Sequence, residues 1–171
     1  MNETNVKSVG LKYGVLLGAA FVGTFFITYL LDLVGNQALG WLPFVLVIVF
    51  VFLALKAFKE GNEGFMSFGQ GFKGGMLTTA VGAIINAIVS YIFLKFAGGD
   101  YFDKVIEVSR ERMEENPGMT EEQVEQAMEF TTRFMTPEIS AISGIVMIAL
   151  MGLVVSLIIS AILKKDVPEG I

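Results

Sequence analysis

The sequence contains no cysteine and no histidine. Without cysteine the chain has no disulfide and no thiolate nucleophile, and without histidine it has no imidazole base. The usual nitrogen and sulfur ligands of a zinc site are missing as well. Most hydrolytic and redox enzymes rely on these side chains. We therefore expect a protein that is not an enzyme, and the sequence assigns no catalytic, cofactor-binding or metal-binding residue.

Charged residues are scarce and unevenly distributed. They make up 17% of the 171 residues, whereas hydrophobic residues make up 54%, and the mean hydropathy is +0.67. These values are too apolar for a soluble domain of this length. Residues 98–138 carry eleven Asp and Glu against four Lys and Arg, so the acidity of the chain belongs to one segment. No basic patch with interleaved aromatic residues is present, which argues against a nucleic-acid partner.

Long uncharged runs are the dominant feature of the chain. A helix rises ~1.5 Å per residue, so about 20 apolar residues cross the ~30 Å hydrocarbon layer of a membrane. We predict an all-α polytopic membrane protein that forms a single domain over residues 1–171. Its four transmembrane helices are expected at residues 11–33, 41–58, 72–96 and 138–163.

Two of these spans have alternative interpretations. The first apolar run follows Lys7 and Lys12 and could be a cleaved signal peptide, but apolar residues continue to Leu31, which is longer than a typical signal peptide. The second run is barely long enough to cross and could be a buried or re-entrant segment. Trp41 at one end and Lys56 at the other favour a full crossing, because both side chains suit the membrane interface.

The acidic segment has two amphipathic helical patterns, and we predict a helical hairpin over about residues 100–135. Asn116-Pro117-Gly118 provides the turn. Thr120 and Gln123 have the spacing of a capping box, as do Ser67 and Gln70 before the third span, and Thr136 is expected to cap the fourth. The apolar faces of the hairpin are expected to meet each other or the membrane surface. Its glutamates indicate a solvated face rather than a cation site, since no calcium-loop motif is present.

Lysine and arginine positions predict the orientation. Positive residues near the ends of membrane spans remain cytoplasmic. The N-terminal arm, the connection at residues 56–75 and the C-terminal tail carry seven lysines, whereas residues 32–40 carry no basic residue. Both termini are therefore expected in the cytoplasm and residues 98–138 outside it.

Small residues repeat at a spacing of four in three of the spans, which lets helices approach closely. The helix-packing candidates are Gly10, Gly14, Gly18, Gly74, Gly82, Asn86, Gly144 and Gly152. Packing within one chain is favoured over a homo-oligomer interface. The second span is bulky on every side and is expected to face lipid. Asn86 is interpreted as a bridge between helices, with substrate binding as the alternative.

Several segments together resemble a known family. The central segment contains Lys56, Lys59 and the run from Gly64 to Gly74, and the hairpin contains the run from Pro117 to Gln123. With the order of the four spans, these features resemble domain of unknown function family 4199, small four-span bacterial membrane proteins. The resemblance covers nearly the whole chain. It implies a location in the bacterial inner membrane and provides no known activity or functional residue.

Two hypotheses for the function follow. The first is a non-enzymatic structural or interaction component of the membrane, whose partners are the lipid bilayer and a second copy or another membrane protein. The alternative is a small transporter or channel component with a path between spans one, three and four. A polar cavity near Asn86 would favour the alternative, and a dry core there would favour the first.

Overall fold

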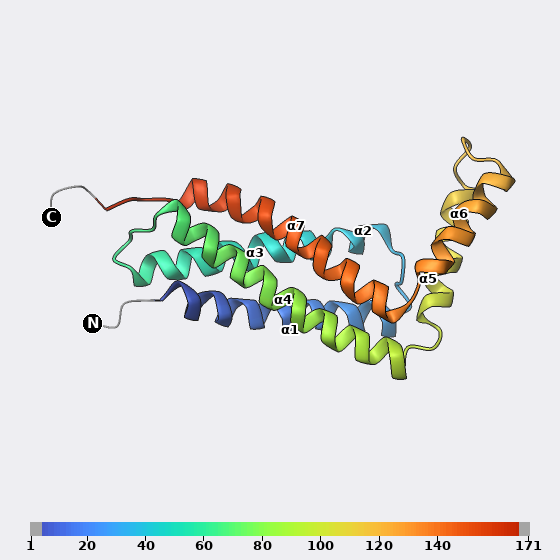
Figure 1. Cartoon of the computed structure of the whole chain (residues 1–171), viewed down its shortest axis with the longest axis horizontal. Coiled ribbons are helices and arrows are strands. Elements are labelled where there is room, and N and C mark those ends of the chain that lie inside the picture. The colour runs from blue at the N-terminus through green and yellow to red at the C-terminus, as the bar shows by residue number, and fades with distance from the viewer. Residues whose placement is uncertain (1–4, 168–171) are drawn as a thin grey trace.

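The computed structural model describes residues 5–167, which fold into seven helices without a β-strand. The helices are α1 (Val6–Leu30), α2 (Gln37–Gly40), α3 (Leu42–Gly61), α4 (Phe68–Phe96), α5 (Tyr101–Glu114), α6 (Glu121–Phe134) and α7 (Pro137–Leu163). Figure 1 shows α1, α3, α4 and α7 side by side in one bundle, with α5 and α6 across one end. The all-α prediction is confirmed.

Four stretches are long and apolar enough to cross a membrane: Val6–Leu30, Gln37–Gly61, Phe68–Phe96 and Pro137–Leu163. They correspond to the four predicted spans, so the chain has the helices of a multi-pass membrane protein. Helix α1 begins and ends before the predicted limits of residues 11–33. Helix α4 begins at Phe68 and thus extends one turn beyond the apolar run that defined the third span.

Side-chain caps fix the starts of three helices. The Ser67 hydroxyl accepts a hydrogen bond from the Gln70 amide at 3.3 Å, and the Gln70 side chain accepts one from the Ser67 amide at 2.9 Å. Thr120 and Gln123 form the same reciprocal pair before α6. Thr136 caps α7 by accepting from the Ile139 amide at 3.3 Å. All three predicted caps are confirmed, and each satisfies backbone donors that a helix start leaves free.

Helix α4 is the centre of the bundle because it packs along both α1 and α7. Glycines permit both contacts. A Cβ atom added to Gly14 of α1 would lie 2.6 Å from Cβ of Val81, and one added to Gly71 of α4 would lie 2.8 Å from Oγ of Ser160. The helices therefore approach more closely than any larger residue would allow.

Helix α3 closes the bundle across α1, α4 and α7. The expectation that this span faces lipid is wrong for one side, because Val47 and Val51 are fully buried. Val45, Val49 and Phe52 on its other side are exposed. The buried side chains of α3 join the core formed with α1, α4 and α7.

Backbone and lysine contacts tie the connection after α3 to the end of α7. Met66 and Lys165 exchange two backbone hydrogen bonds of 2.9 Å each. The Lys59 ammonium donates to the carbonyl oxygen of Leu163 at 2.8 Å. These bonds hold the loop over residues 62–67 against the bundle.

At the other end, α5 and α6 pack against each other (Figure 1). Val124 and Met128 of α6 are buried, and Arg110 of α5 pairs with Glu125 of α6 at 3.0 Å. Phe130 and Phe134 of α6 are exposed and their ring centroids lie 4.6 Å apart. The apolar faces of the two helices thus meet each other in part, and the phenylalanine pair remains uncovered.

Candidate functional site

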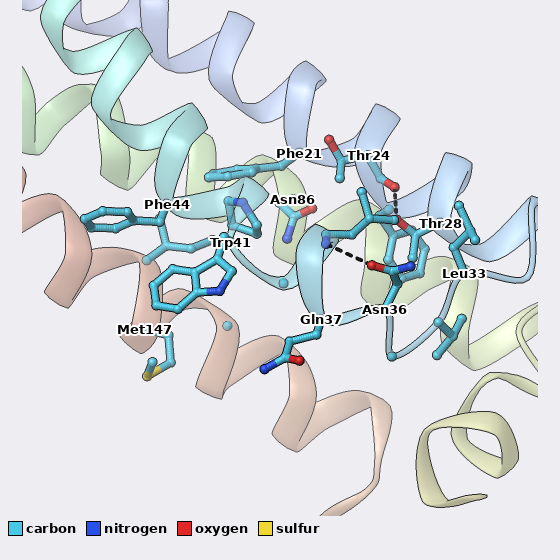
Figure 2. Close-up of a pocket in the computed structure, with 18 of the residues that line it drawn as sticks. Phe21, Thr24, Thr28, Leu33, Asn36, Gln37, Trp41, Phe44, Asn86 and Met147 are labelled. Carbon is cyan, nitrogen blue, oxygen red and sulfur yellow. Dashed lines mark hydrogen bonds between the residues drawn. The ribbon is translucent and has the colours of Figure 1, made fainter. Parts of the chain in front are cut away.

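A pocket of about 800 Å³ lies in the half of the bundle nearest α5 and α6. Figure 2 shows it bounded by the helices of the bundle and by the turn that precedes α3. Its volume is within the range of small-molecule sites. The main lining residues are Phe21, Thr24, Phe25 and Thr28 of α1, Asn86 of α4, and Gly144, Met147, Ile148 and Met151 of α7. The connection at residues 33–41, the start of α3, and Tyr101 and Arg112 of α5 complete it.

The pocket exists because α3 does not cover the whole bundle. The chain after α1 turns through the short helix α2, and α3 begins only at Leu42. The buried residues of α3 begin at Val47, so its first turn contributes no buried contact. Gly144 of α7 borders the uncovered region, and no described atom outside its own stretch of helix lies within 4 Å of a Cβ atom placed there. The half of the bundle beside α2 is therefore hollow.

The opposite end of the pocket is closed. Phe21 and Ile148 line the pocket and are 5% and 7% exposed, and Val47 is fully buried beside them in the same core cluster. Beyond this floor, Leu17, Val51 and Val155 fill the space between the helices. The pocket does not continue through the bundle in this conformation.

Asn86 places an unsatisfied amide in the pocket wall. Its side chain is half-buried and forms no hydrogen bond with any residue from 5 to 167. Thr24 and Thr28 also line the pocket, but their hydroxyls donate to the carbonyl oxygens of Ala20 and Thr24, each at 2.8 Å. The buried unpaired polar side-chain atoms of the described chain are the hydroxyls of Ser156 and Ser160, so the Asn86 amide is accessible from the pocket. Asn86 is therefore suited to a polar group of a molecule that occupies the pocket.

The helical hairpin covers one edge of the pocket through Gly35. Gly35 has a φ of +83°, and Val108 of α5 packs so closely against it that a side chain there would clash. The Arg112 guanidinium donates a hydrogen bond to the Gly35 carbonyl. Asn36 then caps α2 by accepting from the amides of Ala38 and Leu39 at 3.0 and 3.3 Å. The rim of the pocket is thus held by contacts between α5 and the connection before α2.

Ionic groups attach α5 to the end of α1. The Tyr29 hydroxyl donates to Asp100 at 2.7 Å, and Lys104 contacts Asp32 at 2.7 Å and Asp100 at 3.2 Å. The hydrogen bond from Tyr29, reinforced by Lys104, lowers the pKa of Asp100. The hydrogen bonds to Asp32 and Asp100 raise the pKa of Lys104. This cluster fixes the hairpin beside the pocket.

Tyr101 contributes a neutral phenol to the pocket. It is the first residue of α5 and lies against Phe25 of α1, with ring centroids 5.6 Å apart. Burial raises the pKa of Tyr101 above its ordinary value. The side chain therefore stays uncharged at neutral pH and adds no negative charge to the lining.

The helix-packing candidates fall into two groups, one at close contacts between helices and one in the pocket lining. Gly10, Gly14 and Gly18 of α1 face Leu77, Val81 and Ile85 of α4, Gly82 faces Leu17, Gly74 faces Leu55 and Val6, and Gly152 faces Thr79. Asn86 and Gly144 instead line the pocket. The structure therefore separates two residues from a set that the sequence pattern grouped together.

Sequence reasoning did not identify the rim of the pocket. The sequence pattern indicated Asn36 and Gln37 only as turn residues, and it indicated Arg112 only as one of many charged residues on a solvated hairpin. Their place at the pocket depends on how α5 sits on the connection after α1. No local pattern encodes that contact, although Gly35 in a short connection is a weak signal of close approach.

The lining is chemically simple. Within residues 5–167 it contains one charged side chain, Arg112, and its remaining polar groups are hydroxyls, amides and the indole N–H of Trp41. In the same part of the chain, no three acidic side chains come together as ligands for a metal ion. The arrangement can hold an apolar or amphipathic molecule and bond its polar groups.

Comparison with known proteins identifies a family. The family described as Protein of unknown function (DUF4199) matches residues 12–165, which is most of the chain. No curated protein and no solved structure matches the chain.

Proposed function

We propose that this chain, which belongs to the family Protein of unknown function (DUF4199), is a non-enzymatic membrane protein that binds a small apolar or amphipathic ligand between α1, α4 and α7. The observation that carries the proposal is the unpaired amide of Asn86 in the pocket wall. A purely structural bundle would gain stability from a filled pocket.

The pocket favours a transporter component over a purely structural role. It lies between the first, third and fourth spans, where the alternative hypothesis places a path. Its closed floor of Phe21 and Ile148 supports a binding site open from one end rather than a continuous channel. Transport would therefore require movement of α1 or α7 against α4.

The glycine faces support the same choice. Gly14 and Gly18 of α1 and Gly152 of α7 already contact α4 of the same chain. These faces are therefore occupied and need no second copy to cover them. The lining contributed by residues 5–167 contains no carboxylate, which supports a binding role rather than catalysis, since acid–base chemistry requires positioned titratable groups.

The proposed orientation places both termini and the loop over residues 62–67 in the cytoplasm of a bacterium, with α5 and α6 on the outer side of the inner membrane. Support comes from the lysines that flank the loop and the C-terminal end of α7. With this orientation the pocket lies in the outer half of the membrane.

Photolabelling of the purified protein tests the binding site. We expect a diazirine-bearing fatty acid in detergent micelles to crosslink to residues of α1 and α7 at the pocket. Gly144→Phe adds a ring to the pocket wall, at a position where an added Cβ atom meets no other helix. This variant should lose most of the labelling at the pocket.

Gly23→Phe is the matched control. Gly23 lies in α1, also has no described atom within 4 Å of an added Cβ atom, and is not among the lining residues. The Gly23→Phe variant should be photolabelled at the pocket to the same extent as the wild type. Equal labelling of wild type and Gly144→Phe at the same peptides would refute binding in this pocket.

A further inference from the structure

We propose that the pocket binds an anionic membrane lipid, with its phosphate at Arg112 and an acyl chain among the apolar residues of α1 and α7. This inference rests on the proposed function and names the ligand class of the same pocket. Three features carry it: an uncompensated arginine at the rim, free amides along the lining, and an apolar wall that borders the lipid phase.

Among the described basic residues near this end of the bundle, Arg112 and Arg133 form no ion pair, and of these two only Arg112 lines the pocket. Lys95 pairs with Glu138, Lys104 with Asp32 and Asp100, and Arg110 with Glu114 and Glu125. Arg112 has no carboxylate of the described chain within 4 Å, although it belongs to the most acidic segment. Its charge therefore remains available at a rim that contains no other charged side chain among residues 5–167.

The guanidinium retains donors for a phosphate. Arginine has five N–H donors in a planar fork that matches phosphate oxygens in pairs. Arg112 uses one nitrogen to donate to the Gly35 carbonyl, and this bond positions the group beside the connection at residues 33–41. The other edge of the fork is free of hydrogen bonds to the described residues and can bind an anionic headgroup.

Amide groups extend the polar path from the rim into the pocket. The Gln37 side chain lines the pocket and forms no hydrogen bond with the described residues. Asn86 lies on α4, in the wall formed by the membrane spans (Figure 2). The ester carbonyls of a lipid lie between its headgroup and its chains, and Asn86 can donate to one of them. The rest of the lining is mainly apolar and suits an acyl chain.

The wall formed by α7 belongs to the exposed apolar surface of a candidate membrane span. Met147 lines the pocket and is 58% exposed, and its neighbours Ile142 and Val146 are exposed as well. Trp41, at the start of α3, also lines the pocket and is 68% exposed, as is common for tryptophan at a membrane interface. A lipid can therefore enter sideways from the bilayer without passing through water.

The experiment measures which lipid the protein retains. Wild-type protein is placed in nanodiscs of equal phosphatidylglycerol and phosphatidylethanolamine, released into mild detergent and analysed by native mass spectrometry. We expect bound phosphatidylglycerol to exceed phosphatidylethanolamine. Arg112→Gln should lower the ratio of the two lipids about tenfold, which is the effect of losing one charge-assisted hydrogen bond. Addition of inorganic phosphate should not displace the bound lipid.

Arg133→Gln is the matched control, because Arg133 lies on α6 of the same hairpin and does not line this pocket. It should keep the wild-type ratio. Each variant must retain the thermal melting temperature of the wild type, and Arg112→Lys should recover part of the preference if its fold is intact.

The outcomes separate the two proposals. An unchanged lipid ratio in Arg112→Gln would overturn the assignment of the headgroup site. Equal retention of both lipids, lost in Gly144→Phe, would overturn the anionic preference and leave the binding pocket standing. Retention of neither lipid, together with failed photolabelling, would overturn the proposed function itself. Displacement by phosphate alone would indicate a free anion rather than a lipid.

Discussion

At the scale of single residues, the bundle depends on glycines whose missing side chains let α1 and α7 touch α4. An added Cβ atom at Gly14 would approach the Val81 Cβ at 2.6 Å and the Thr78 backbone oxygen at 3.0 Å. The backbone oxygen belongs to a helix and cannot move aside as a flexible side chain would. Larger residues at Gly14 therefore force α1 away from α4.

We predict that Gly14→Ala lowers the free energy of unfolding by about 1–3 kcal/mol, the usual cost of overpacking a tight contact. Gly23→Ala in the same helix should have no cost, because no described atom lies within 4 Å of its added Cβ atom and alanine is the better helix former. Unfolding in mixed detergent and SDS micelles, followed by circular dichroism, measures both. Equal stability of the two variants would contradict the close contact.

Asp100 makes the attachment of the hairpin sensitive to acid. Its pKa is lowered by the Tyr29 hydroxyl and then by Lys104, so the folded protein binds fewer protons there than the unfolded chain does. The resulting stability is present above the ordinary aspartate pKa of about 4 and is lost as the pH falls through the lowered pKa.

We predict that the melting temperature of the wild type falls more than that of Asp100→Asn when the pH is lowered from about 5 to about 3. The asparagine oxygen can still accept from Tyr29, so the variant removes the titration and largely keeps the hydrogen bond. Other carboxylates titrate in both proteins, and the difference between the two curves isolates Asp100. Parallel curves would contradict this role.

At the scale of elements, α3 decides where the bundle is solid and where it is hollow. Its buried residues run from Val47 to Phe58, and Leu55 contacts the glycine face of α4, with its Cδ2 atom 3.1 Å from an added Cβ at Gly74. The first turn of α3 makes no such contact. The pocket is therefore the direct result of where α3 begins to pack.

We predict that Leu55→Ala costs about 2 kcal/mol or more, because it leaves a cavity at a contact between three helices. Leu53→Ala changes the same residue type in the same helix at a position that is 39% exposed. Its cost should be within about 0.5 kcal/mol, since lipid or detergent replaces the lost contact. The same unfolding assay compares the two, and the opposite ranking would show that α3 packs by its other face.

The elements themselves were largely predictable from sequence, and their packing was not. Uncharged runs and capping boxes depend on neighbouring residues, so Ser67, Thr120 and Thr136 marked the starts of three helices. The buried face of α3 could not be predicted from the sequence. Valine and phenylalanine occur on both sides of this helix, and either residue is suited to a surface that faces lipid. The rim at Arg112 depends on a contact between segments that are 77 residues apart.

At the scale of the whole molecule, the two ends of the bundle differ. Near the loop over residues 62–67, glycine contacts and the core residues of α3 fill the interior, and the backbone bonds between Met66 and Lys165 close that end. Near α5 and α6 the interior is open and its border carries Arg112 and the amides. A bundle that is sealed at one end and open at the other suits a protein that receives its ligand from one side of the membrane.

That side can be determined because the sequence has no cysteine. Single cysteines introduced as Asn62→Cys and Gly118→Cys are therefore unique targets for a maleimide that cannot cross membranes. Both positions lie in turns, at opposite ends of the bundle. In intact bacterial spheroplasts we expect Gly118→Cys to be labelled and Asn62→Cys to be labelled only after lysis, because the lysines around residue 62 favour the cytoplasm. The reverse pattern would place the pocket in the inner leaflet, and labelling of both would contradict a crossing by α4, the one candidate span between the two positions.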